Sequence, residues 1–269
     1  MQLTRGLIAI GALALAGCNL STDLPTNRRL GLFTVNQSGA VDNALLDVNA
    51  LFFQPGANDQ IALPNSAAVP DNCVEADYAP PVDGVLRKLD NLNAGESIAM
   101  TTDKADTVLR PVTNSVGTVI YVVPGGGFVP FTPGSDVTFE IPGDPSGYPA
   151  DTIKIRTLEP LTLAAVERKP TNELHLSWSP VGSAGGGVRL QFLYSSDSSA
   201  TPNKSLNCDL RDDGEFDIPG FVTDGWASSP AEAQSIVGFR WATLIRSQQD
   251  VVLHVTNQVQ INPPTFTDN

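Results

Sequence analysis

Histidine and cysteine are scarce in this chain of 269 residues, which contains two histidines and three cysteines. The sequence has no Cys-x-x-Cys pair and no His-Glu-x-x-His motif, and these absences remove the usual redox and zinc sites. His175 and His254 each lie between two apolar residues in an alternating segment, so we expect both to face solvent or a sheet edge. Neither has a carboxylate, thiol or second histidine in its local sequence, and we assign neither a catalytic or metal-binding role.

Basic residues are also few, with 16 lysines and arginines against 29 aspartates and glutamates. Residues 1–17 contain one basic residue, Arg5, and no acidic residue, so the rest of the chain has 15 basic and 29 acidic side chains and a net charge of −14. Phosphate backbones and anionic lipid headgroups repel a protein of this sign. We therefore expect no nucleic-acid partner.

Motifs for acyl transfer and phosphate binding are missing as well. No Gly-x-Ser-x-Gly sequence occurs, so hydrolase chemistry through an acyl-enzyme has no support in the sequence. The three glycines at 125–127 lead into Phe128 and Pro130 rather than into a helix, which predicts a loop tip and not a phosphate-binding loop. We assign no catalytic residue.

The only extended apolar run of the N-terminal region reaches from Leu7 to Leu15 and follows the positive charge of Arg5. This run is too short to cross a bilayer as a helix. Its length, the preceding charge and the small residues that follow are typical of a secretory signal peptide. The sequence therefore predicts a signal peptide over residues 1–17.

The run ends in Leu15-Ala16-Gly17-Cys18, which resembles the lipobox of bacterial lipoproteins at all four positions. The resemblance implies that the signal is cut before Cys18 and that this cysteine carries acyl chains, such as palmitate, which anchor the protein to a membrane of the cell envelope. Asn19 stands where many inner-membrane lipoproteins carry aspartate, which favours the outer membrane. The alternative is a plain signal peptide that a cysteine happens to follow.

Glycine and proline are abundant, with 23 and 21 residues, and they separate short apolar segments. This pattern predicts an all-β chain with little helix. The 252 residues after the signal peptide are near the size at which one hydrophobic core divides into two. We predict a flexible tether over 18–29, followed by two immunoglobulin-like β-sandwich domains in series at 30–159 and 160–269.

The second predicted domain opens with an alternating segment, Leu174-His175-Leu176-Ser177-Trp178, followed by Ser179-Pro180. A leucine-rich strand that delivers a tryptophan just before such a turn resembles the opening of a fibronectin type III domain. The resemblance implies that Trp178 lies in the core of a sandwich. The acidic segment 195–220 departs from that pattern, and we expect a loop there.

With Cys18 assigned to lipid, Cys73 and Cys208 remain as a pair in an oxidising compartment. We predict a disulfide between them, which would tie the two predicted domains together. The alternative is two buried, unpaired thiols.

Five carboxylates fall within nine residues directly after Cys208, and four of them are candidate calcium ligands: Asp209, Asp212, Asp213 and Glu215. Calcium prefers oxygen ligands, and Gly214 permits a tight turn between them. The spacing is not that of an EF-hand loop. The simpler interpretation is a strand that presents its carboxylates to water.

Four aromatic residues close to predicted turns form a second candidate surface: Phe128, Phe131, Tyr148 and Trp226. Exposed aromatic rings on loops can stack on sugars or anchor a protein partner. The alternative, which we favour, is that these rings are part of the core. We assign Trp178 and Trp241 to the core.

These observations favour a lipid-anchored, non-enzymatic bacterial cell-envelope protein that presents two β-sandwiches for adhesion, assembly or ligand binding. The expected partners are the membrane, through the acyl chains on Cys18, and an envelope protein or glycan. We keep two alternatives: a carbohydrate-active or hydrolytic protein whose carboxylates assemble in three dimensions, and a calcium-binding extracytoplasmic module. We expect no cofactor other than that calcium.

Overall fold

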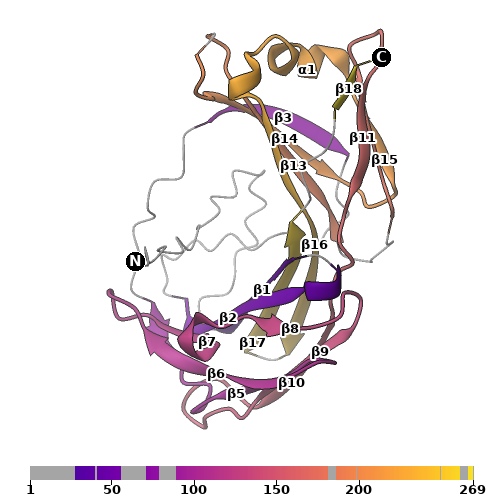
Figure 1. Ribbon diagram of the computed structural model, residues 1–269. Coiled ribbons are helices and arrows are strands. Elements are labelled where there is room, and N and C mark those ends of the chain that lie inside the picture. Colours follow the sequence, from indigo (N-terminus) through magenta and orange to yellow (C-terminus); the bar gives the residue numbers. More distant parts are fainter. Residues whose placement is uncertain are drawn as a thin grey trace, which may run out of the picture.

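A computed structural model describes residues 28–39, 41–55, 71–78, 89–180, 186–197, 199–248, 250–260 and 266–268 (Figure 1). Strands dominate it, and its one α-helix among these residues has eight residues. The elements in chain order are β1 (Arg29–Ser38), η1 (Val41–Asn43), β2 (Leu45–Gln54), β3 (Asn72–Asp77), β4 (Asp90–Asn91), β5 (Ile98–Thr101), β6 (Asp106–Thr113), β7 (Val119–Val122), η2 (Pro124–Gly126), β8 (Val129–Pro130), β9 (Asp136–Ile141), β10 (Asp151–Arg156), β11 (Leu163–Arg168), β12 (Leu174–Trp178), β13 (Gly186–Tyr194), β14 (Lys204–Leu210), β15 (Glu215–Ile218), α1 (Gly220–Ala227), η3 (Ala231–Ala233), β16 (Ser235–Gln248), β17 (Val251–Gln260) and β18 (Phe266–Asp268).

Fourteen strands form one large mixed sheet, and four form a small sheet in the order β15-β12-β11-β18. The main path of the large sheet is β10-β9-β5-β6-β7-β2-β1-β17-β16-β13-β14-β3, with β4 and β8 pairing β2. The β-rich prediction is confirmed. One continuous sheet, however, runs through the molecule where two separate immunoglobulin-like sandwiches were expected.

The first hydrophobic core lies inside the lower part of the molecule, between strands of the first half of the chain and β17 (Figure 1). It is rich in aromatic rings: Phe33 contacts Phe52 at 5.7 Å and Phe139 at 5.1 Å between ring centroids. The alternation predicted for residues 136–141 is confirmed, because Val137, Phe139 and Ile141 are all buried. Period-two burial of this kind is what a strand with one covered face produces.

Side chains from β16 and β17 cover the outer edge of β10. Arg246 on β16 donates to the carbonyl of Thr152, and Asn257 on β17 donates to the carbonyl of Arg156, at 3.1 and 2.9 Å. These bonds occupy carbonyls that would otherwise face an unpaired strand edge. The two bonds link β10 to β16 and β17 beside the first core.

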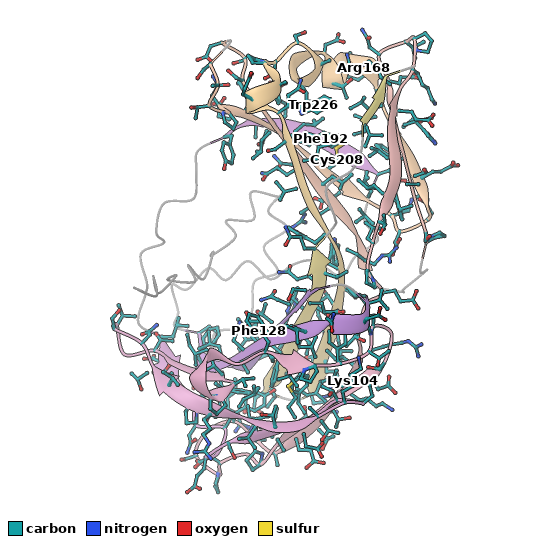
Figure 2. The ribbon with its side chains drawn as sticks, viewed as in Figure 1. Lys104, Phe128, Arg168, Phe192, Cys208 and Trp226 are labelled. Carbon is teal, nitrogen blue, oxygen red and sulfur yellow. A yellow bond between two sulfur atoms is a disulfide. The ribbon has the colours of Figure 1, made fainter. Side chains whose placement is uncertain are left out.

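The second core lies between the small sheet, α1 and the far end of the large sheet, in the upper part of the molecule (Figure 1). Leu174, Leu176 and Trp178 are buried in it, as their alternation predicts. Phe192 and Trp226 meet edge to face with ring centroids 5.8 Å apart (Figure 2). The rings of this core come from one strand of each sheet and from the helix.

Each core contains a strand from the other half of the chain. β17 pairs in parallel with β1, and Leu253 and Val255 on β17 belong to the first core. β3 pairs with β14 and contributes Cys73 to the second core. Neither core is therefore built from one continuous half of the sequence.

Strand β16 passes from one core to the other, because residues 235–242 pair with β13 and residues 239–248 pair with β17. Arg240 lies at this transition and is 1% exposed. Its Nε lies 2.8 Å from Asp212 Oδ2, and its Nη1 donates to the carbonyl of Glu159 at 3.1 Å. Its Nη2 donates to the carbonyl of Ser179, and the Trp178 indole donates to Asp212 Oδ1 at 2.9 Å. Four separate chain segments thus meet at one buried ion pair.

Replacing Asp212 with alanine is expected to lower the free energy of unfolding by about 3 to 5 kcal/mol, because Arg240 would stay buried without its counter-charge. The matched control is Asp213→Ala, since Asp213 is the adjacent aspartate and its side chain is 49% exposed. That control should change stability by less than about 1 kcal/mol. Urea unfolding curves measure both, and equal effects would contradict the assigned role of the buried pair.

Candidate functional site

The first described residues of the chain are fastened to the tip of the β16–β17 hairpin. Arg28 donates to Ser247 Oγ at 2.6 Å, and Arg29 forms an ion pair of 3.0 Å with Asp250. Arg29 also donates to the carbonyl of Gly147 at 2.8 Å. The chain thus enters the body at a defined point. Cys18 and the predicted signal peptide over 1–17 lie outside the described residues, as does most of the predicted tether over 18–29.

The predicted disulfide is present between Cys73 on β3 and Cys208 on β14. The two cysteines are direct partners in the antiparallel register, and Cys208 is fully buried in the second core (Figure 2). The prediction that this bond ties two halves together was wrong in one respect. Strand β3 belongs to the first half of the chain but lies at the edge of the second core. The bond therefore links β3 to its neighbour β14 within that core and does not join two separate domains.

Replacing both Cys73 and Cys208 with alanine is expected to lower the free energy of unfolding by about 5 kcal/mol in the chain-entropy model. The reason is that the bond joins residues 135 positions apart. Guanidinium unfolding with and without dithiothreitol measures the effect. Reductant should destabilise the wild type and leave the double variant unchanged; a wild type indifferent to reductant would show that the bond does not form.

The four calcium candidates do not gather at one point. Asp209 pairs with Arg189 at 2.6 Å, Asp212 is taken by Arg240, and Asp213 lies 3.8 Å from Arg211. Glu215 is exposed on β15. Within the described ranges, no three histidine, cysteine, aspartate or glutamate side chains are grouped closely enough to hold a metal ion.

The segment 195–220, expected to be a loop, contains two strands, β14 and β15. Leu206, Cys208 and Leu210 alternate with polar residues and are fully buried, so their burial holds β14 in the sheet. Glu215 and Asp217 face water on β15, as the simpler interpretation of the acidic segment predicted.

His175 lies in a row of charges on the outer face of the small sheet. Its Nδ1 is 2.7 Å from Asp217 Oδ1, and Lys169 Nζ donates to the other carboxylate oxygen at 2.8 Å. The Lys169 hydrogen bond is the larger cause, and the His175 bond a smaller one, of the lowered pKa of Asp217. His175 has no carboxylate close to it in sequence. Its partner Asp217 lies on the neighbouring strand, 42 positions away.

His254 does not face solvent or a sheet edge, contrary to the prediction, because it is only 2% exposed. β17 lies between β1 and β16, and both of its faces are covered. Leu253 packs into the first core, while Val252 on the opposite face packs with Leu30 and Phe53 in a small separate cluster. Alternation alone cannot distinguish such a strand from one with a solvated face.

The Asp217 carboxylate gives stability a dependence on acidic pH. Because its folded pKa lies below the ordinary value of 3.8, its contribution is complete above about pH 5 and is lost as the pH falls through and below 3.8. Asp217→Asn should therefore flatten part of the acid limb of the stability profile, by a small amount because the group is largely exposed. Urea midpoints measured from pH 5 to pH 2 check this. An unchanged acid limb would contradict it.

Most of the aromatic candidates belong to the cores, as the favoured interpretation predicts. Phe131, Tyr148 and Trp226 are 2% exposed or less, whereas Phe128 is 48% exposed (Figure 2). Trp178 and Trp241 are buried as assigned. Sequence reasoning missed Phe221, which is 83% exposed because it stands on the outer side of α1, an element that was not predicted.

An open groove of about 970 Å³ lies beside strands β5, β9 and β10. Three chain segments line it: 93–99, 140–144 and 150–152. Four carboxylates are among its lining residues: Glu96, Glu140, Asp144 and Asp151. Glu96 lies 44 positions before Glu140, the first of the other three, and no local motif predicted this group.

The walls of this acidic groove are held by close backbone contacts. Asp144 accepts from the Ser146 hydroxyl and backbone N–H and from the Asn93 amide, and these bonds, led by that of the hydroxyl, lower its pKa. A Cβ on Gly143 would lie 2.2 Å from the nitrogen of Ala150, and one on Gly147 would lie 2.1 Å from the carbonyl oxygen of Asn93. Only glycine permits these approaches, so the segments around the groove are tightly joined.

Comparison with known proteins identifies no relative of this chain. No protein-family model, no curated protein and no solved structure matches it. The helices within the described ranges include none of the length and apolarity needed to span a membrane.

Proposed function

We propose that this chain is a lipid-anchored, non-enzymatic protein of the bacterial cell envelope, held through acyl chains on Cys18 and presenting its β-rich body for adhesion, assembly or ligand binding. The observation that carries the proposal is the complete Leu15-Ala16-Gly17-Cys18 lipobox behind a short apolar run. Two or more acyl chains give stable anchoring, whereas one gives marginal binding. An anchor of this kind suits a body with a net charge of −14, which anionic headgroups repel.

The position of the chain entry supports this proposal and gives the body an orientation. Arg28 and Arg29 lie at the tip of the β16–β17 hairpin, and β16 reaches the second core at its other end. A strand of 14 residues is about 46 Å long. An anchor at Cys18 would therefore place the first core next to the membrane and the second core, with α1 and Phe221, away from it.

The finer fold assignment belongs to the same proposal. We propose that residues 160–269 form a sandwich similar to a fibronectin type III domain. Its support is that Leu174, Leu176 and Trp178 on the small sheet are buried against residues of β13 and β14 in the large sheet. Facing sheets with interdigitated inner residues are the architecture of such sandwiches.

A second candidate function, a carbohydrate-active or hydrolytic protein, has one observation in its favour. The acidic groove gathers carboxylates from separate segments, as a glycosidase does with its acid and base. Glu140→Gln should then abolish any glycan hydrolysis that the wild type shows. A variant that retains this hydrolysis would remove the groove from consideration as its active site.

Intact mass spectrometry and membrane fractionation test the anchored function. The wild type is expected to lose residues 1–17, to gain the mass of a diacylglycerol on Cys18 and usually a further acyl chain, and to sediment with membranes. Cys18→Ser should lose both the added mass and the sedimentation. A wild type that is cleaved, unmodified and soluble would overturn the proposal.

Asn19→Asp serves as the matched control for that experiment, because it leaves Cys18 and the cleavage motif intact. It should keep the acyl mass, and by the resemblance to inner-membrane lipoproteins it should shift the protein from outer-membrane to inner-membrane fractions. An unmodified Asn19→Asp variant would show that the Cys18→Ser result reflects general damage to export.

A further inference from the structure

We propose that Arg28-Arg29 is the site at which a protease specific for basic residues can separate the body from its anchor, and that the β16–β17 hairpin restrains this cleavage. Proteases of the trypsin type cut after lysine or arginine, because an aspartate in their specificity pocket pairs with the basic side chain. The inference rests on the proposed anchor at Cys18 and adds to it a controlled point of release.

The distribution of basic residues along the sequence singles out this pair. Residues 18–27, between the predicted acyl anchor and Arg28, contain no lysine or arginine. Residues 30–86 contain none either, so Arg28 and Arg29 are the only basic residues between Cys18 and Arg87. A protease of the trypsin type therefore has no other point of attack near the anchor.

The disulfide prevents cuts further along the chain from releasing the body. Cys73 on β3 is bonded to Cys208 on β14. Any single cut between these two cysteines leaves both pieces covalently joined, and no basic residue lies between Arg29 and Cys73. Of the basic residues between Cys18 and Cys208, only Arg28 and Arg29 can therefore yield a body free of its anchor after one cut.

Both arginines are held by the hairpin, in a clasp formed by Arg28, Arg29, Ser247 and Asp250. Arg29 Nε and Nη2 donate to the two carboxylate oxygens of Asp250, each at 3.1 Å, and the Arg29 backbone N–H donates to the Asp250 carbonyl at 2.6 Å. Arg28 Nη1 donates to Ser247 Oγ at 2.6 Å. Two parallel bonds between a guanidinium and a carboxylate fix the direction as well as the distance of the pair.

The clasp opposes cleavage because the start of β1 must detach before a protease can act on it. Arg29 pairs with Val251, and Leu30 pairs with both Val252 and Phe53. Proteases cut most readily where the backbone is exposed and free of such hydrogen bonds. When detachment and reclosing are faster than cutting, the cleavage rate follows the population of the detached form, which the clasp keeps small.

Limited trypsin digestion of membranes that carry the full-length protein tests the proposal. The body released into the supernatant should begin at Arg29 or Leu30, as read by intact mass. Asp250→Ala should release it about fivefold faster than the wild type, which corresponds to the loss of one favourable ion pair.

The matched control is Asp213→Ala, because the Asp213 side chain is 49% exposed against 52% for Asp250 and lies outside the clasp. Release from this control should stay within about 1.5-fold of the wild type. Cleavage after Lys104, which is exposed between β5 and β6, reports general loosening of the body (Figure 2). Equal acceleration of release by both aspartate substitutions, or equal acceleration at Lys104, would overturn the proposal.

Failure of the anchor and failure of the clasp give different results. A protein that is soluble before trypsin is added contradicts the anchored function, and its new N-terminus still reports whether Arg28-Arg29 is cut. A sedimenting protein whose released body begins at another residue contradicts the assigned cleavage site alone. Equal rates of release from the wild type and Asp250→Ala contradict the restraint by the clasp.

Discussion

The arrangement of the whole molecule depends on one buried ion pair, between Arg240 and Asp212. A charged arginine excluded from water is costly unless it is paired, and here Nη1 and Nη2 donate to two main-chain carbonyls and to Asp212 Oδ1, while Nε faces Asp212 Oδ2 as an ion pair without a hydrogen bond. These partners come from the β14–β15 turn, the segment after β10 and the segment after β12. Losing any of these bonds would leave a buried charge or carbonyl without its partner, and this energetic cost fixes how the two cores are joined.

Polar side chains also bind backbone and side-chain groups on the two outermost strands of the large sheet. β10 is an outermost strand, yet Arg246 and Asn257 occupy two of its carbonyls. At the other end of the large sheet, β3 is held by a disulfide and carries Glu75 and Asp77, which bond to Tyr194 and Lys204. Occupied and charged edges disfavour pairing with a second molecule. The two outer strands of the long mixed sheet are thus protected by side chains on their own edges.

Sequence reasoning succeeded where the signal is local. Alternation located the buried faces of β9 and β12, because side chains on a strand point to opposite sides with a period of two. The disulfide was predictable because only two thiols remained once Cys18 was assigned to lipid.

What was missed depends on pairing between distant residues. Alternation could not show that β17 has both faces covered, and so His254 was placed in solvent. The disulfide lies within the second core because β3 pairs with β14, and no local sequence pattern predicts this pairing. The acidic groove arises from three separate segments for the same reason. Helix α1 was missed because its sequence, Gly220–Ala227, has two glycines and little helical propensity, and packing of Trp226 holds it.

The parallel pairing of β1 with β17 sets the order in which the chain can acquire structure. Arg29 lies opposite Val251, 222 positions later, so one of the first described strands to be synthesised has its neighbour near the end of the chain. During synthesis from the N-terminus the first core stays open until residue 260 has emerged. Contacts so distant in sequence make folding slow. The topology itself therefore postpones closure of the first core until β17 has been made, long after its neighbour β1.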